Sequence, residues 1–207
     1  MLNRQIWTLA TGSAAVTVLV AMLSGCQVDA HDKGDGKEVK IATPFGGLHV
    51  TTNDKEVLEE VGLPAYPGAT TVKKKDNDDG AADVDMSFGG FQLRVKAVGF
   101  TTADTPDKVE AFYRGELKRY GDVIKCKDDK PVGTPTRTFE GLSCDSHEGG
   151  HVQVDDHPGR NEIELKTGSK LHQRIVSIEP EGGGTKFGLV VLDLPKGSSG
   201  NDNDTRQ

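Results

Sequence analysis

Hydrophobic and polar residues alternate most regularly between residues 83 and 100. Apolar side chains occupy every second position on both sides of a diglycine: Val84, Met86, Phe88, Phe91, Leu93, Val95 and Ala97. A two-residue turn at Gly89-Gly90 brings Phe88 opposite Phe91 in a β-hairpin. The same register joins opposite charges on the face expected to meet water, pairing Asp85 with Arg94 and Asp83 with Lys96. The apolar pattern and the charge pattern therefore predict the same hairpin.

A spacing of three to four residues replaces this alternation after Thr105 and predicts the main helix, at about 106–120. Thr105 suits the N-cap, Pro106 suits the first helical position, and Gly121 suits the end. Apolar side chains share one side of this helix: Val109, Phe112, Tyr113, Leu117 and Tyr120. An aromatic stripe of this kind can line a ligand groove, but we expect it to pack on the sheet.

A second, short helix is predicted at about 54–61 from its end signals. Asn53 and Glu56 have the spacing of a capping box, in which each side chain satisfies a free backbone N–H group. Gly62, with Pro64 beyond it, is typical of a helix end.

Strands are predicted on both sides of these helices. Alternation near 39–41 and 48–50 predicts a hairpin around a loop at 44–47, with Ile41 opposite Val50 and Thr43 opposite Leu48. Further strand-like stretches lie at 122–127, 138–146, 151–155, 162–166, 173–179 and 186–194. The last two pair around Gly182-Gly183-Gly184, setting Ile178 opposite Phe187 and Val176 opposite Leu189. Hairpins with two helices predict an α+β fold with a largely antiparallel sheet.

The first 25 residues have the layout of a secretory signal peptide. Arg4 lies in a short basic region, an apolar run follows from Ile6 to Leu23, and no acidic residue precedes Asp29. The run ends in Leu23-Ser24-Gly25-Cys26, which resembles the lipobox of bacterial lipoproteins with type II signal peptides. That resemblance implies cleavage after Gly25, acylation of Cys26 with fatty acids such as palmitate, and anchoring in a membrane. The alternative is a soluble cysteine after a discarded leader.

Segment boundaries follow from this interpretation. Residues 26–37 are polar and are expected to form a lipidated tether, with the globular domain at 38–195 and a disordered tail at 196–207. Gln27 follows the acylated position; because aspartate there favours inner-membrane retention in lipoproteins generally, the outer membrane is favoured if the cell has one.

The stretch VGLPAYPGAT at 61–70 and the helix segment FTTADTPDKVEAFYRGELKRYG at 100–121 resemble a group of bacterial envelope proteins. Those proteins share a YPGA turn and a helix containing Phe-Tyr. The resemblance implies a fold and an exported location, and it brings no activity, cofactor or catalytic residue.

Charge and cysteine content narrow the function classes. The formal charge of −7 becomes −8 when Arg4 is removed with the leader, which disfavours nucleic acid as a partner. Cys126 and Cys144 form an even pair in an exported chain and predict a disulfide. The alternative for this pair, a redox or metal-binding site, lacks C-x-x-C spacing.

The motif His147-Glu148-Gly149-Gly150-His151 fits the H-E-x-x-H signature of zinc proteases, which needs both histidines on one helix face. Two glycines disfavour a helix there by roughly 1 kcal/mol each. Alternating flanks predict a hairpin instead, in which His147 faces His151 beside Asp145. Those three residues are weak candidates for binding a transition metal, with solvated histidines as the alternative.

Other polar clusters give less support for a binding site. The loop at 76–80 fails the calcium pattern, because alignment of Gly80 puts Lys75 and Met86 at ligand positions. His31 with Asp32 and Asp35 lies on the expected tether. Surface or capping roles are expected for His49, His157 and His172.

The sequence therefore predicts an envelope-anchored lipoprotein that binds another envelope component or has a structural role, with no cofactor and no catalytic residue. The expected partners are the membrane, through Cys26, and an envelope protein or polymer. The alternatives are a zinc-dependent hydrolase using His147, Glu148 and His151, and a metal-handling lipoprotein using the same histidines.

Overall fold

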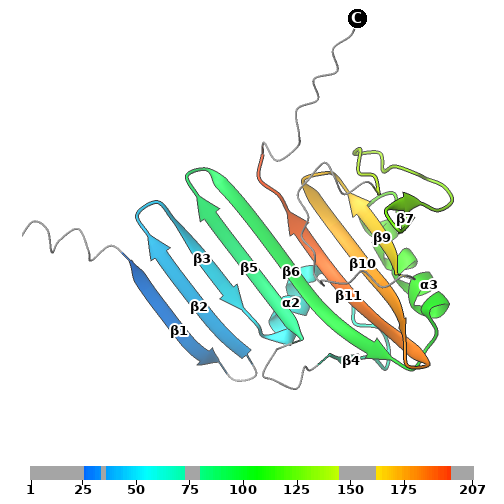
Figure 1. Ribbon diagram of the computed structural model, residues 1–207, viewed down its shortest axis with the longest axis horizontal. Helices are drawn as coiled ribbons and strands as arrows, with labels where there is room; N and C mark the ends of the chain where they lie inside the picture. Colours follow the sequence, from blue (N-terminus) through cyan, green and yellow to red (C-terminus); the bar gives the residue numbers. More distant parts are fainter. Residues whose placement is uncertain (1–25, 34–35, 73–79, 145–161, 197–207) are drawn as a thin grey trace, which may run out of the picture.

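The computed structural model describes residues 26–33, 36–72, 80–144 and 162–196. These residues form an 11-stranded sheet in the order β1-β2-β3-β5-β6-β11-β10-β9-β7-β8, with β4 paired to β6. Every pairing is antiparallel. The strands are β1 (Gln27–Lys33), β2 (Gly36–Thr43), β3 (Gly46–Thr51), β4 (Thr70–Thr71), β5 (Ala81–Phe88), β6 (Phe91–Thr102), β7 (Ile124–Lys127), β8 (Lys130–Pro131), β9 (Ile163–Gly168), β10 (His172–Glu181) and β11 (Gly184–Asp193). The predicted α+β class with a dominant antiparallel sheet is confirmed (Figure 1).

Two helices, α2 (Asp54–Val61) and α3 (Pro106–Leu117), pack on the same side of the sheet, called here the helix face. Helix α2 contacts β5 and β6, and α3 contacts β9, β10 and β11. Their buried residues meet apolar residues of the central strands in one core: Val57, Val61, Val98, Phe100, Val109, Tyr113, Leu117, Leu165, Val176, Ile178, Phe187, Leu189 and Val191. The aromatic stripe of α3 therefore packs on the sheet, as predicted. Val109, Tyr113 and Leu117 are fully buried.

The helix ends follow the sequence signals closely. Asn53 caps α2, its side-chain oxygen accepting a hydrogen bond from the Glu56 N–H group at 3.0 Å. Gly62 closes the same helix at φ 72°, a left-handed conformation that glycine adopts without a side-chain clash. Helix α3 begins at Pro106 as predicted, but it ends at Leu117, and Lys118–Tyr120 form a 3₁₀ turn before Gly121.

Two predicted hairpins are confirmed in register. In β5–β6, Phe88 faces Phe91, Asp85 faces Arg94 and Asp83 faces Lys96. In β10–β11, Ile178 faces Phe187 and Val176 faces Leu189.

The prediction of which face of β5–β6 meets water was wrong. Asp83 and Lys96 lie on the helix face, where the side chain of Lys96 reaches Glu60 of α2. The alternating apolar residues of this hairpin lie on the opposite face, which no helix covers in the described part of the chain. Figure 1 looks onto that opposite face, with α2 behind β5 and β6. The charged side chains are therefore the partly buried ones.

The β2–β3 hairpin forms with a different register. Ile41 faces Leu48 and Val39 faces Val50, instead of the predicted pairs. The turn is tighter than the predicted loop, because Thr43 pairs with Gly46 and only Pro44 and Phe45 connect the strands. A shift of two residues keeps each side chain on its face, so the alternation alone could not reveal it.

The segment expected to be a lipidated tether contributes a strand. Gln27–Lys33 form β1 and pair with β2, which itself begins at Gly36. Strand β1 lies at the edge of the sheet, and its described side chains are mostly exposed. Because neither face of β1 needs to be apolar, the sequence at 27–33 is polar and lacks the alternation that would predict a strand. Cys26 therefore lies directly beside the sheet.

The stretch predicted as a strand at 138–146 is irregular as far as it is described, to Cys144. It makes only isolated bridges, through Gly141 and Ser143. Thr138 organises it instead: its backbone N–H group donates to the Leu142 carbonyl, and its hydroxyl donates to the Gly168 carbonyl at 2.7 Å. Leu142 then packs with Ile124 beside the bridged cysteines. The predicted strand at 151–155 lies outside the described residues.

Candidate functional site

Charged side chains form two transverse rows across the helix face of the sheet, each row made of residues that face one another on neighbouring strands. In the first row the charges alternate in sign, with a histidine at two places: Asp29, Lys40, His49, Asp85, Arg94, Asp193 and His172. The second row lies one pleat further in: His31, Glu38, Thr51, Asp83, Lys96, Val191, Arg174 and Thr167. Opposite charges on directly facing positions attract, so the alternation supports this register.

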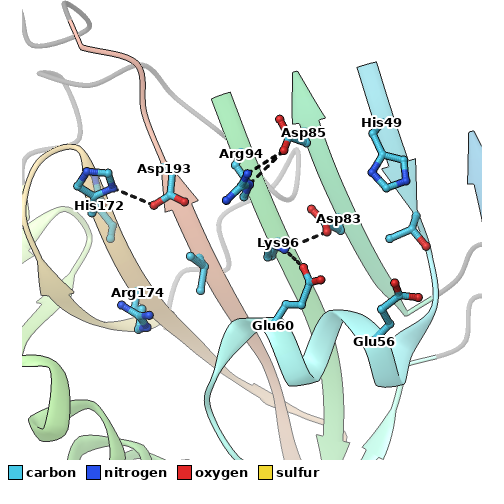
Figure 2. A pocket seen from close by; sticks show the side chains of 13 residues that line it. His49, Glu56, Glu60, Asp83, Asp85, Arg94, Lys96, His172, Arg174 and Asp193 are labelled. Carbon is cyan, nitrogen blue, oxygen red and sulfur yellow. Dashed lines mark hydrogen bonds and ion pairs between the residues drawn. The ribbon is translucent and has the colours of Figure 1, made fainter. Parts of the chain in front are cut away.

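The middle of these rows lines an open cleft of about 550 Å³ beside helix α2 (Figure 2). Its walls come from α2 and from strands β3, β5, β6, β11 and β10. The lining residues are His49, Thr51, Glu56, Glu60, Asp83, Asp85, Arg94, Lys96, His172, Gln173, Arg174, Val191 and Asp193. Acidic residues dominate near α2 and β5, whereas Arg174 and His172 stand at the β10 side. The cleft thus has an acidic end and a basic end.

Ion pairs neutralise its centre. Arg94 donates to Asp85 from two nitrogens, at 2.9 and 3.2 Å. That hydrogen bond raises the pKa of Arg94, so the guanidinium is fixed in its charged form. Lys96 joins Asp83 at 3.0 Å and also contacts Glu60.

Asp83 is the most buried carboxylate of the cleft, with 8% of the residue exposed. Burial raises its pKa, because a charge loses water there. Burial lowers the pKa of Lys96 for the same reason. Asp83 Oδ1 has no hydrogen-bond partner among the described residues. Lys96 is therefore the cation that holds this carboxylate directly, through Oδ2, and the buried Oδ1 is left without a donor among the described residues.

Arg174 is held at the basic end by packing rather than by an ion pair with any described residue. Its guanidinium carbon lies 4.0 Å from the centre of the Tyr120 ring, a cation–π contact. Its Nε is buried without a hydrogen-bond partner in the described structure, as is the hydroxyl of Thr167, the residue facing it on β9. Arg174 is thus positioned to bind an anionic group.

The two cleft histidines have carboxylate partners on neighbouring strands. His172 Nδ1 lies 3.0 Å from Asp193 Oδ1, and His49 Nε2 lies 3.0 Å from Glu38 Oε1. Four strand spacings separate β3 from β10, roughly 19 Å at about 4.8 Å each, so these histidines cannot share a metal ion. The described residues contain no group of three or more metal-ligating side chains. The described residues that line the cleft include no serine or cysteine that His172 could activate as a nucleophile.

Residues predicted as site candidates divide into three groups. Cys126 and Cys144 form the predicted disulfide, with a Cα–Cα distance of 5.6 Å. Cys26 has a free, exposed thiol at the start of β1. Asp145, His147, Glu148, His151 and His157 lie outside the described residues, as do residues 76–79 of the acidic loop that ends at Gly80.

The cleft itself was not predicted from the sequence. The sequence predicted surface or capping roles for His49 and His172, which are isolated in the sequence; in the structure both line the cleft, with charged neighbours from strands far apart in the chain. The charge pairs of β5–β6 were the available signal, because their register was correct and only their face was wrong.

Comparison with known proteins adds no relative: no protein-family model, curated protein or solved structure matches this chain. Among the described residues, no helix is long and apolar enough to cross a membrane.

Proposed function

We propose that this protein is a lipid-anchored component of the bacterial cell envelope that acts by binding another envelope component, and not by catalysis. The leader and the lipobox sequence ending at Cys26 support the anchor. The exposed position of Cys26, next to β1, is compatible with acylation. An outer-membrane position is favoured if the cell has such a membrane, because Gln27 and not aspartate follows Cys26.

The charged cleft is the single observation that carries the binding role. Its acidic end carries the carboxylates of Glu56, Glu60 and Asp83, and its basic end carries the Arg174 guanidinium. A ligand with separated positive and negative groups satisfies both ends, so we propose a mixed-charge peptide segment of an envelope partner. Charged groups held in place by the sheet give such a cleft selectivity as well as attraction.

The anchor is tested by the mass of the full-length protein expressed in a bacterium fed an alkyne-tagged fatty acid. We expect tag incorporation and loss of the mass of residues 1–25, and neither change in Cys26→Ala. An unlabelled parent protein that keeps its leader would overturn the anchor.

The binding role is tested by photo-crosslinking in intact cells. A photoreactive amino acid at His172, which lines the cleft with a side chain 70% exposed, is compared with one at Phe139, which is 97% exposed and is not part of the cleft. We expect a discrete adduct from position 172 only. The adduct should be lost when Arg174→Gln is added, and the thermal unfolding midpoint should show that this variant is still folded. An identical adduct from both positions, or one that persists in Arg174→Gln, would contradict binding through the cleft.

A further inference from the structure

One end of the sheet brings the start of β1 next to two hairpin turns. Gln27 faces Ala42, so Cys26 adjoins the end of β2 at Thr43. Thr43 pairs with Gly46, Gly46 with Phe88, and Phe88 with Phe91. The acylation candidate and the β2–β3 and β5–β6 turns thus share one margin of the molecule, at the upper left of Figure 1.

Large apolar side chains are exposed along this margin. Phe45 is 78% exposed, Phe88 55%, Phe91 45% and Val28 63%. These four residues are called the aromatic rim. The two turns that carry the phenylalanines are joined, because the Gly89 N–H group donates to the Phe45 carbonyl at 3.2 Å. The rim is therefore a connected surface and not a set of scattered side chains.

The same margin contains no charged residue over three successive transverse rows. Residues 26–28, 41–48 and 86–93 include no Asp, Glu, Lys, Arg or His, although 28% of the chain is charged. At about 3.3 Å per strand residue, three rows give a charge-free depth of roughly 7–10 Å. The opposite margin differs: Asp54 and Lys55 follow β3, and Glu181 ends β10.

We propose that the aromatic rim inserts into the interface of the bilayer that holds the acylated Cys26. Peripheral segments bury apolar side chains about 5–10 Å deep at the boundary of headgroups and acyl chains, a depth that matches the charge-free rows. The position of the bilayer rests on the proposed lipid anchor. Because β1 begins at Gln27, the anchor has no slack between the lipid and the sheet, so the rim is held at the membrane surface.

Insertion of the rim would fix the position of the cleft relative to the bilayer. Asp29 and Lys40 begin the first charged row, which lies one residue further from the margin, and so from the bilayer, than Val28 and Ile41. That row then lies at headgroup level, and the charged cleft opens immediately above the membrane. The cleft therefore meets ligands close to the membrane surface.

Depth-dependent fluorescence quenching tests the proposal on the full-length protein, purified from membranes and placed in phosphatidylcholine vesicles. Trp7 is replaced by phenylalanine, and a single tryptophan is introduced as Phe45→Trp. The vesicles contain phospholipid brominated near either the headgroup end or the methyl end of its chains. We expect emission at position 45 to shift to the blue and to be quenched mainly by the shallow bromines.

Two matched variants separate insertion from mere tethering. Glu181→Trp, at the end of β10 on the opposite margin, reports on a part of the protein that is not expected to enter the bilayer, so its emission should not be quenched. Adding Phe88→Ser and Phe91→Ser to Phe45→Trp should remove most of the quenching while the protein stays in the vesicle fraction.

The outcomes distinguish this inference from the lipid anchor. Acylated protein without quenching at position 45, or with equal quenching at position 181, overturns the rim and leaves the anchor standing. If mass spectrometry finds no acyl group, the anchor fails, and the same protein is mixed with vesicles. Selective quenching at position 45 then still supports the rim, and its absence overturns the rim as well.

Discussion

Lys96 Nζ lies 3.0 Å from Asp83 Oδ2 between the sheet and helix α2, with 12% and 11% of the two side chains exposed. Glu60 of α2 contacts the same ammonium group. This cluster stands where the apolar core of the sheet gives way to the charged cleft. It therefore both fixes the position of α2 and shapes the acidic end of the cleft.

Replacing Lys96 with methionine should lower the free energy of unfolding by about 3 kcal/mol, because the buried carboxylate of Asp83 loses its cation. Lys40→Met is the matched control, because Lys40 pairs with Glu38 while 57% of the lysine side chain is exposed. This substitution should change the free energy of unfolding by less than about 0.5 kcal/mol. Urea unfolding near neutral pH measures both.

Adding Asp83→Val to Lys96→Met should recover most of the loss, since no buried unpaired charge remains: Glu60 also loses its cation, but 43% of its side chain is exposed to water. A double variant as unstable as Lys96→Met would show that the lysine stem, and not the ion pair, carries the effect.

Glu110 of α3 gives stability that depends on pH. Burial disfavours its charge, but hydrogen bonds from Lys125 and Arg114 outweigh burial and lower its pKa below the usual 4.5. A lowered pKa in the folded state stabilises the protein above pH 4.5 and loses that contribution as the pH falls through the folded-state value. Glu110→Gln should therefore cost about 1 kcal/mol at pH 7.

The difference between Glu110→Gln and the parent should shrink steadily below pH 4.5, measured as paired urea midpoints from pH 7 to pH 3. A difference that stays constant over this range would mean that the glutamate charge contributes nothing.

Gly115 offers a stabilising change. It lies on the exposed side of α3, and a β-carbon there would meet no atom within 4 Å. Gly115→Ala should raise the free energy of unfolding by about 1 kcal/mol, because alanine loses less backbone freedom in a helix. Gly46→Ala should have the opposite effect, since its β-carbon would collide with the backbone carbonyl of Ser87. Thermal unfolding of the two variants tests the helix and the β3–β5 contact separately; stabilisation by both would contradict the close approach at Gly46.

Short-range patterns predicted much of the fold. The Gly89-Gly90 turn, the Asn53 cap and the Pro106 start each depend on residues close together in the chain, and each is correct. Strand β1 was missed because an edge strand exposed to water needs no apolar alternation.

The cleft depends on which distant strands become neighbours. Asp83 and Lys96 share a hairpin, but the position of α2 over them decides that their face is the partly buried one. Arg174 joins the same cleft only because β11 lies between β6 and β10. A single sequence carries no local signal for the position of α2 over β5 and β6 or for the position of β11 between β6 and β10. The charge-free segments around Phe45 and Phe88, in contrast, can be found in the sequence once the register of their strands is known.

The Cys126–Cys144 disulfide should matter most for the segment that lacks regular strands. It closes a loop with a sequence separation of 18 residues, and its loss should lower the free energy of unfolding by about 3 kcal/mol in the chain-entropy model. Cys126→Ala/Cys144→Ala measures this cost by urea unfolding, with the reduced parent protein as a second route to the same state. Thr138 and Leu142 hold the loop by hydrogen bonds and packing, so the variant should stay folded at 25 °C and should first gain protease cleavage between 128 and 144. Unchanged cleavage there, with an unfolding midpoint equal to that of the oxidised parent, would show that these contacts alone fix the segment.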